Sequence, residues 1–136
     1  MSAVRITWLA GALLASANVT SSGTAVTSAD WSRAEGVNVR MLEYEFAPDQ
    51  LRFRTDLPYQ LHLINDGKEG HDFTAPNFFN AVEIRNPEAL GAGKSSIYVK
   101  PGETADIYFI ADKAGLFAPR CADHDWAGMK ATIIVD

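Results

Sequence analysis

Residues 121–129 read CADHDWAGM. They place Cys121, His124 and Met129 in a C-x2-H-x4-M spacing. A strand is expected to end near Cys121, and apolar residues alternate with polar ones again at 131–135. The segment is therefore predicted to be a tight loop between two strands. Such a loop can direct a thiol, an imidazole and a thioether toward one point.

Alternation of apolar and polar residues recurs along most of the chain. It also covers residues 37–41, 51–53, 59–63, 97–99 and 107–109. Turn signals such as Asn65-Asp66-Gly67 and Pro101-Gly102 separate these runs. Period-two alternation with frequent turns predicts an all-β sandwich or barrel over residues 30–136.

Residues 77–90 break this rhythm. Phe78 and Val82 stand four positions apart, which predicts a short helix near 77–83. Pro87 is expected to stop that helix, because a proline cannot continue the helical hydrogen bonding. The segment is therefore predicted to be an excursion between two strands.

Composition limits the possible functions. The chain has 136 residues, enough for one domain, and its net charge is −5 from 12 Lys+Arg and 17 Asp+Glu. The lack of a basic stripe argues against nucleic acid as a partner. A single Cys excludes an internal disulfide, a zinc finger and a dithiol redox pair. Three His are too few for the copper cluster of a multicopper oxidase.

The start of the chain has the pattern of a secretory signal peptide. Arg5 precedes an apolar run at 6–14, and Ala15-Ser16-Ala17 is a small-x-small site. Residues 1–29 are predicted to be a signal peptide and flexible leader, with cleavage after residue 17, 25 or 29; a buried N-terminal helix is the alternative. A membrane-spanning helix needs about 20 apolar residues, and this run is shorter. No membrane span is therefore expected once the signal peptide is removed. The protein is predicted to be periplasmic or otherwise exported, with a net charge of −6 once Arg5 is gone.

A fourth ligand has to come from outside residues 121–129. His71, after Glu69 and Gly70, is the candidate, because loop ends supply sites more often than strand middles. His62 lies in the middle of an alternating run and is expected to be exposed on a strand. One thiolate, two imidazoles and one thioether suit copper, and two His with one Cys and a long axial Met form a blue-copper electron-transfer site.

The chain resembles the small cupredoxins of the plastocyanin, pseudoazurin and amicyanin type. The resemblance is most specific at residues 121–129, with their Gly-Met pair, and at His71 after the third strand and a turn. It implies a Greek-key β-sandwich with one type 1 copper ion at one end. It also implies His71, Cys121, His124 and Met129 as the copper ligands.

Three positions next to the expected ligands depart from that family. Asp72 stands where Asn is common, Arg120 where an aromatic residue is common, and Asp123 where Pro is common. Together with Glu69 and Asp125, the two aspartates are expected to form a solvated acidic rim that favours Cu(II) over Cu(I). Arg120 is expected to pair with Asp72 or Asp123.

The resemblance implies a periplasmic electron carrier, not an enzyme. Single electrons would pass between redox partners, such as a c-type cytochrome or an oxidoreductase, by Cu(I)/Cu(II) cycling. His71 would be the buried imidazole and His124 the edge through which electrons leave. Trp126 is expected either to pack on the end of the sandwich or to join an apolar docking face. The acidic charge suggests a partner with a basic face.

Other functions remain open at this stage. The same ligands could serve a periplasmic protein that binds, stores or delivers copper. A metal-free β-sandwich could serve as an adhesion or interaction module. An enzyme such as a nitrite reductase would need further copper ligands from a partner subunit. Three phenylalanines are expected to belong to the core or to cover the copper site: Phe73, Phe78 and Phe79.

Overall fold

The computed structural model describes residues 24–136. Most of the predicted leader lies outside these residues, so the signal peptide and its cleavage site stay predictions. The leader's last residues include a short helix, α1 (Thr24–Ser28), which lies against β6 and β8. A 3-10 turn, η1 (Trp31–Arg33), follows it. Trp31 donates from Nε1 to the carbonyl of Val26 at 3.0 Å, which ties η1 to α1.

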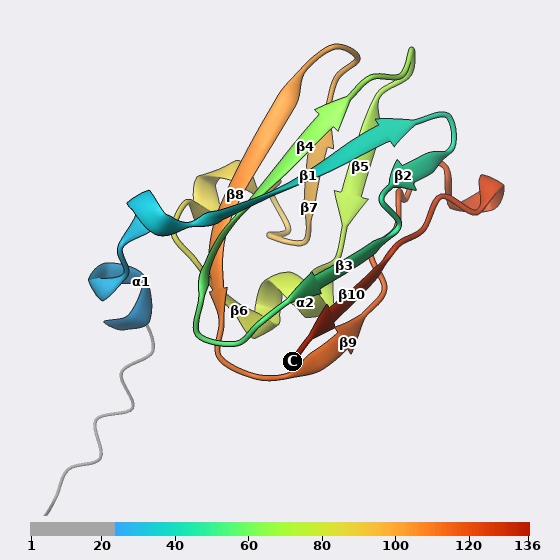
Figure 1. Ribbon diagram of the computed structural model, residues 1–136. Helices are drawn as coiled ribbons and strands as arrows, with labels where there is room; N and C mark the ends of the chain where they lie inside the picture. Colours follow the sequence, from blue (N-terminus) through green and yellow to red (C-terminus); the bar gives the residue numbers. More distant parts are fainter. Residues whose placement is uncertain (1–23) are drawn as a thin grey trace, which may run out of the picture.

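Five strands form the first layer of the fold (Figure 1). The parallel pair β1 and β4 lies near its centre, and β4 runs antiparallel to β8. Val39 of β1 stands opposite Leu63 of β4, so apolar side chains share one face of this layer. The order across the sheet is β2 (Glu45–Ala47), β1 (Glu35–Leu42), β4 (Pro58–Asn65), β8 (Thr104–Ala111) and β6 (Val82–Ile84).

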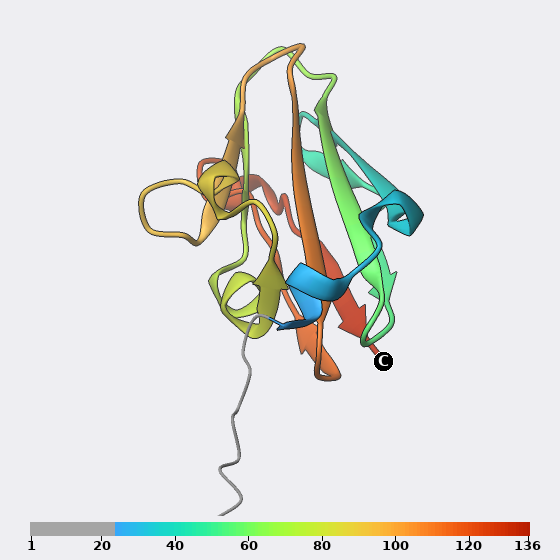
Figure 2. The ribbon, with the colours of Figure 1, turned by 90° about the vertical axis from the view of Figure 1, so that its left-hand side faces the viewer.

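The second layer combines a three-stranded and a two-stranded sheet. The first is β3 (Gln50–Phe53), β10 (Thr132–Val135) and β9 (Gly115–Phe117); the second is β5 (His71–Thr74) with β7 (Ser96–Val99). Isolated bridges from Arg120 to Thr74 and to Lys130 join the two sheets. Figure 2 shows the layers from the side, with β4 and β8 facing the layer that contains β7. The prediction of an all-β Greek-key sandwich is confirmed.

The core lies between the two layers and is rich in aromatic rings. Phe53 contacts Tyr59 and Phe109 at centroid distances of 4.9 and 5.0 Å. Phe78 of the helical excursion contacts Phe109 at 5.2 Å. Of the two roles predicted for Phe73, Phe78 and Phe79, a place in the core is confirmed, since all three are buried in it. These ring contacts lie at the end of the sandwich where β3 and β8 finish and β4 begins.

The helical excursion is shorter than the sequence predicts. Helix α2 (Pro76–Ala81) is present, with a proline in its first turn. It does not extend to residue 83, because Val82 starts strand β6 and pairs with Ala111 of β8. Backbone pairing with β8 thus overrides the helical spacing of Phe78 and Val82. The prediction that Pro87 stops the helix is wrong, because α2 has already ended at Ala81 and Pro87 begins a 3-10 turn, η2 (Pro87–Ala89).

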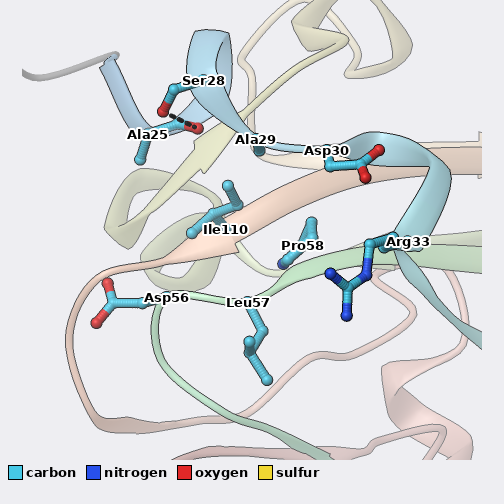
Figure 3. A pocket seen from close by; sticks show the side chains of 9 residues that line it. All are labelled: Ala25, Ser28, Ala29, Asp30, Arg33, Asp56, Leu57, Pro58 and Ile110. Atoms are coloured by element: carbon cyan, nitrogen blue, oxygen red, sulfur yellow. Dashed lines mark hydrogen bonds between the residues drawn. The ribbon is translucent and has the colours of Figure 1, made fainter.

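A cavity of about 450 Å³ lies where the N-terminal segment meets the turn before β4 (Figure 3). Its lining comes from α1, η1, that turn and β8, and it contains no Cys, His or Met. The cavity is therefore separate from the candidate ligands. Within residues 24–136, no helix is long and apolar enough to span a membrane.

Candidate metal centre

The four predicted ligands gather at one end of the sandwich. His71 is the first residue of β5. Cys121, His124 and Met129 belong to the loop between β9 and β10, which includes the 3-10 turn η3 (Asp125–Ala127). His71, Cys121 and Met129 are fully buried, and the side chain of His124 is 13% exposed. In Figure 1, η3 lies at the edge of the fold beside β2.

Backbone hydrogen bonds close the loop onto itself. The amide of Cys121 donates to the carbonyl of Met129 at 3.0 Å, and the amide of His124 donates to the carbonyl of Cys121 at 3.2 Å. Gly128 ends η3 with φ 76°, a left-handed conformation that favours glycine. The turn then returns the chain to Met129. This geometry confirms the tight loop that the C-x2-H-x4-M spacing predicts.

Three donor atoms converge at the centre of this end. His71 Nδ1 lies 3.2 Å from His124 Nδ1, and His124 Nδ1 lies 3.3 Å from Cys121 Sγ. One ligand atom from each residue lies within 4.8 Å of the other two. Two nitrogens bound to the same ion at about 2.0 Å each must lie within roughly 4 Å of one another. His71, Cys121 and His124 are therefore positioned to bind one metal ion.

Asp72 holds the two ligand segments together. It follows His71 in β5 and is 7% exposed. Its carboxylate accepts hydrogen bonds from the amides of Ala122 at 2.8 Å and Asp123 at 3.3 Å, and from the hydroxyl of Thr74. The prediction that Asp72 belongs to a solvated rim is wrong, because these hydrogen bonds draw the carboxylate inward. They also hold Asp72 to residues that follow Cys121.

The environments of Asp72 and Cys121 shift their pKa values in opposite directions. Burial opposes ionisation of Asp72, but the hydrogen bonds from Thr74 and from the amides of Ala122 and Asp123 hold its pKa below the usual value. Burial raises the pKa of the Cys121 thiol, and the nearby Asp72 carboxylate adds to that rise. The metal-free thiol therefore keeps its proton, which a bound metal ion would displace.

The turn between β1 and β2 also reaches the centre. Glu43 Oε1 lies 3.3 Å from His71 Nε2, and the Tyr44 ring lies 4.8 Å from the His124 ring. Glu69 Oε2 lies 3.0 Å from His124 Nε2. Sequence reasoning named Glu69 only as part of a rim and missed Glu43 and Tyr44. No spacing in the sequence signals that their turn folds over the ligands.

The structure separates the remaining candidates. His62 is a strand residue of β4 outside the cluster, as predicted, but it is half-buried and not exposed, because it pairs with Asp106 at 2.6 Å. The Arg120 guanidinium pairs with Asp125 at 3.2 Å. The predicted pairing of Arg120 with Asp72 or Asp123 is wrong, because Asp72 is turned inward and Asp125 stands within reach on η3.

Trp126 is exposed next to the cluster. Its side chain is 77% exposed, and its ring lies 5.3 Å from Tyr44 and 6.4 Å from His124. Its Nε1 donates to the carbonyl of Asp123 at 3.1 Å, which fixes the indole on the loop. Trp126 thus rests against Tyr44 at the end of the sandwich and leaves most of its surface exposed.

The donor set fits copper. A thiol and two imidazoles converge, and a buried methionine is joined through its backbone to the same loop. Imidazole and thiolate with a thioether suit copper, whereas structural zinc sites take four Cys or His ligands. Within residues 24–136, the His, Cys, Asp or Glu side chains whose ligand atoms lie close enough to hold one metal ion are those of His71, Cys121 and His124.

No protein-family model matches the sequence, and no curated protein matches it. Solved structures match the fold. Auracyanin B is 21% identical, with a TM-score of 0.57 over 76% of this chain and 89% of its own. Reduced auracyanin from the photosynthetic bacterium Roseiflexus castenholzii is 14% identical, with a TM-score of 0.56 over 76% and 98%.

A larger protein contains the same arrangement as one part of its chain. The multicopper oxidase from Campylobacter jejuni, a metallo-oxidase, is 17% identical, with a TM-score of 0.54 over 74% of this chain and 30% of its own. At these identities the likeness concerns the fold, and the fit to copper comes from this chain's own residues. The chain thus has the cupredoxin fold, with His71, Cys121 and His124 positioned at one end of the sandwich to bind a metal ion.

Proposed function

We propose that this chain is a type 1 copper protein that carries single electrons between redox partners. The convergence of His71 Nδ1, His124 Nδ1 and Cys121 Sγ at a buried end of the sandwich is the observation that carries the proposal. Under this proposal the chain carries electrons and does not act as an enzyme. The leader pattern at residues 1–17 supports export to the periplasm.

Bound copper would supply a one-electron Cu(II)/Cu(I) couple to this centre. The protein's part is to hold the donors in one arrangement and to keep water away. The closed loop and the Asp72 hydrogen bonds restrict movement of Cys121 and His124. Full burial of His71 and Cys121 excludes solvent from their side chains. Donors that stay in place require little rearrangement when one electron enters or leaves, which favours carriage over release of the metal.

Met129 is proposed as the weak fourth ligand. It is fully buried, and its carbonyl accepts the amide hydrogen of Cys121. Met129→Leu should keep copper bound and raise the reduction potential, because a weak donor to Cu(II) is lost. Cyclic voltammetry checks the shift against Met41→Leu, which makes the same change at the buried methionine of β1. A potential that moves in Met41→Leu and not in Met129→Leu would contradict the assignment.

The proposed docking surface for a redox partner surrounds Trp126. The exposed indole stands beside Tyr44 and His124, so a partner that covers it comes close to a ligand imidazole. Exposed acidic groups lie nearby, with Glu69 next to His124. The net charge of −5 complements a basic partner surface. A c-type cytochrome or an oxidoreductase with such a surface is the proposed partner class, bound through a small, short-lived contact.

Electron exchange with a basic c-type cytochrome tests this function. The copper-loaded, reduced chain should reduce the oxidised cytochrome, and stopped-flow absorbance follows both proteins. The second-order rate should fall as ionic strength rises from about 0.01 M to about 0.1 M, because the Debye length shrinks from about 30 Å to about 10 Å. Inert behaviour toward any one-electron acceptor, ferricyanide included, would contradict the carrier function. A rate that does not change with salt would contradict the acidic docking surface.

A further inference from the structure

The turn between β1 and β2 is anchored to the loop that leads into His71. Glu43 supplies the anchor, because its Oε1 accepts hydrogen bonds from the amides of Lys68 at 2.6 Å and Glu69 at 2.7 Å. These amides belong to the loop between β4 and β5. One carboxylate oxygen thus fixes the backbone just before the first ligand.

The same oxygen reaches the ligand itself. Glu43 Oε1 lies 3.3 Å from Nε2 of His71, whose side chain is fully buried. The close approach depends on Gly67, since a Cβ at that position would lie 2.3 Å from Glu43 Oε1. The amides of residues 68 and 69 hold this oxygen in place, so the carboxylate could not move aside without losing them. Glu43 is therefore built into the structure next to His71.

The neighbouring residue of the turn covers the other imidazole. The Tyr44 ring lies 4.8 Å from the His124 ring, at an interplanar angle of 35°. Its hydroxyl donates to Glu69 Oε1 at 3.4 Å, and Glu69 Oε2 lies 3.0 Å from His124 Nε2. Tyr44 and Glu69 thus enclose the outer edge of His124.

We propose that the β1–β2 turn positions both ligand imidazoles and selects their tautomer. Glu43 would accept the Nε2–H of His71, and Glu69, held by Tyr44, would accept the Nε2–H of His124. A neutral imidazole has one N–H, so each Nδ1 would then present a lone pair to the cluster. Residues that bond the far nitrogen of a ligand histidine orient the ring and fix its tautomer. This inference rests on the proposed copper site and adds Glu43 and Tyr44 to it as positioning residues.

The two imidazoles lie so close together that their tautomers decide whether the space between them favours a metal ion. His71 Nδ1 and His124 Nδ1 lie 3.2 Å apart in a buried place. Two lone pairs that face each other there are unfavourable until a cation or a proton lies between them. By holding the ring protons on the outside, Glu43 and Glu69 leave the inside ready for a metal ion. The chain would therefore be preorganised for metal before any metal arrives.

The first test measures the tautomers directly in the unmodified chain. Long-range ¹H–¹⁵N NMR of the metal-free protein at mildly alkaline pH distinguishes Nε2–H from Nδ1–H rings. The expected result is the Nε2–H form for both His71 and His124. An Nδ1–H form for His71 would overturn the proposal. This readout needs no copper, so it stands or fails separately from the proposed function.

The second test removes the carboxylate and restores its acceptor. Glu43→Ala should weaken Cu(I) binding about 10- to 100-fold, measured by competition with a chromogenic chelator. Glu43→Gln keeps an acceptor oxygen and should recover most of the affinity. Glu45→Ala removes an exposed carboxylate from β2 and should bind like the parent chain. Parent affinity in Glu43→Ala would overturn the role of Glu43, whereas a parent chain that binds no copper would instead overturn the proposed function.

Discussion

Cys121→Ser is expected to abolish the intense visible absorption that the chain develops with Cu(II). That absorption requires a thiolate bonded to Cu(II), and Cys121 is the only cysteine in the sequence. A serine hydroxyl is a hard donor with a far higher pKa, so it replaces neither the charge nor the covalency of the sulfur. The remaining imidazoles of His71 and His124 can still hold Cu(II), so a pale, weakly absorbing complex is expected. Titration with Cu(II), followed in the visible range, measures the loss.

A matched control separates this effect from disturbance of the loop. Ala122→Ser places a hydroxyl on the next residue, which is exposed, and leaves the thiol intact. It should retain the colour of the parent chain. Retained intense colour in Cys121→Ser would contradict the ligand assignment. Loss of colour in both variants would assign the effect to the loop and not to the sulfur.

Asp72→Ala is expected to weaken both the ligand loop and the metal site. The carboxylate accepts the amides of Ala122 and Asp123, and its loss leaves these donors without that partner. Because the two amides are only partly buried and can turn to water, the expected loss of unfolding free energy is about 1–3 kcal/mol in total. Metal affinity should fall about 10- to 100-fold, since a residue that holds the ligands in place is gone. Urea unfolding and chelator competition measure the two effects.

Two further substitutions give this prediction its controls. Asp112→Ala removes one carboxylate from an exposed position and should change neither stability nor metal affinity by a measurable amount. Asp72→Asn keeps one acceptor oxygen and should lie between the parent and Asp72→Ala. If Asp72→Ala matched Asp112→Ala in both measurements, the tie between the two ligand segments would be refuted.

The ligand loop could be predicted from the sequence because its parts are local. Cys121, His124 and Met129 lie within nine residues, and a tight turn between strands can form only a few arrangements. The strands were predictable for a similar reason, because alternation reports directly which face of a strand is buried. His71 required more: it was identified as a residue at the end of a loop and through resemblance to a family. The structure confirms its place beside the loop.

Other features depend on contacts between distant segments. Glu43 lies 28 residues before His71, and nothing in either segment shows that the β1–β2 turn folds back over it. Asp72 looked like a surface charge because its partners, two backbone amides, leave no mark on the sequence. Strand β6 could not be predicted for the same reason, because its pairing with β8, and not the local sequence, ends the helix before residue 82. The alternation of apolar and polar residues in a sequence predicts which side chains are buried, but it does not predict which loops contact one another.

The most direct test of a redox copper centre is the visible spectrum of the purified chain, without the predicted signal peptide, with Cu(II), before and after ascorbate. We expect an intense thiolate-to-copper band that ascorbate bleaches and an oxidant restores. This result would follow from Cys121 and both imidazoles binding one ion that accepts and returns an electron. A colourless or weakly absorbing product would contradict the account, because it would mean that Cys121 does not bind Cu(II).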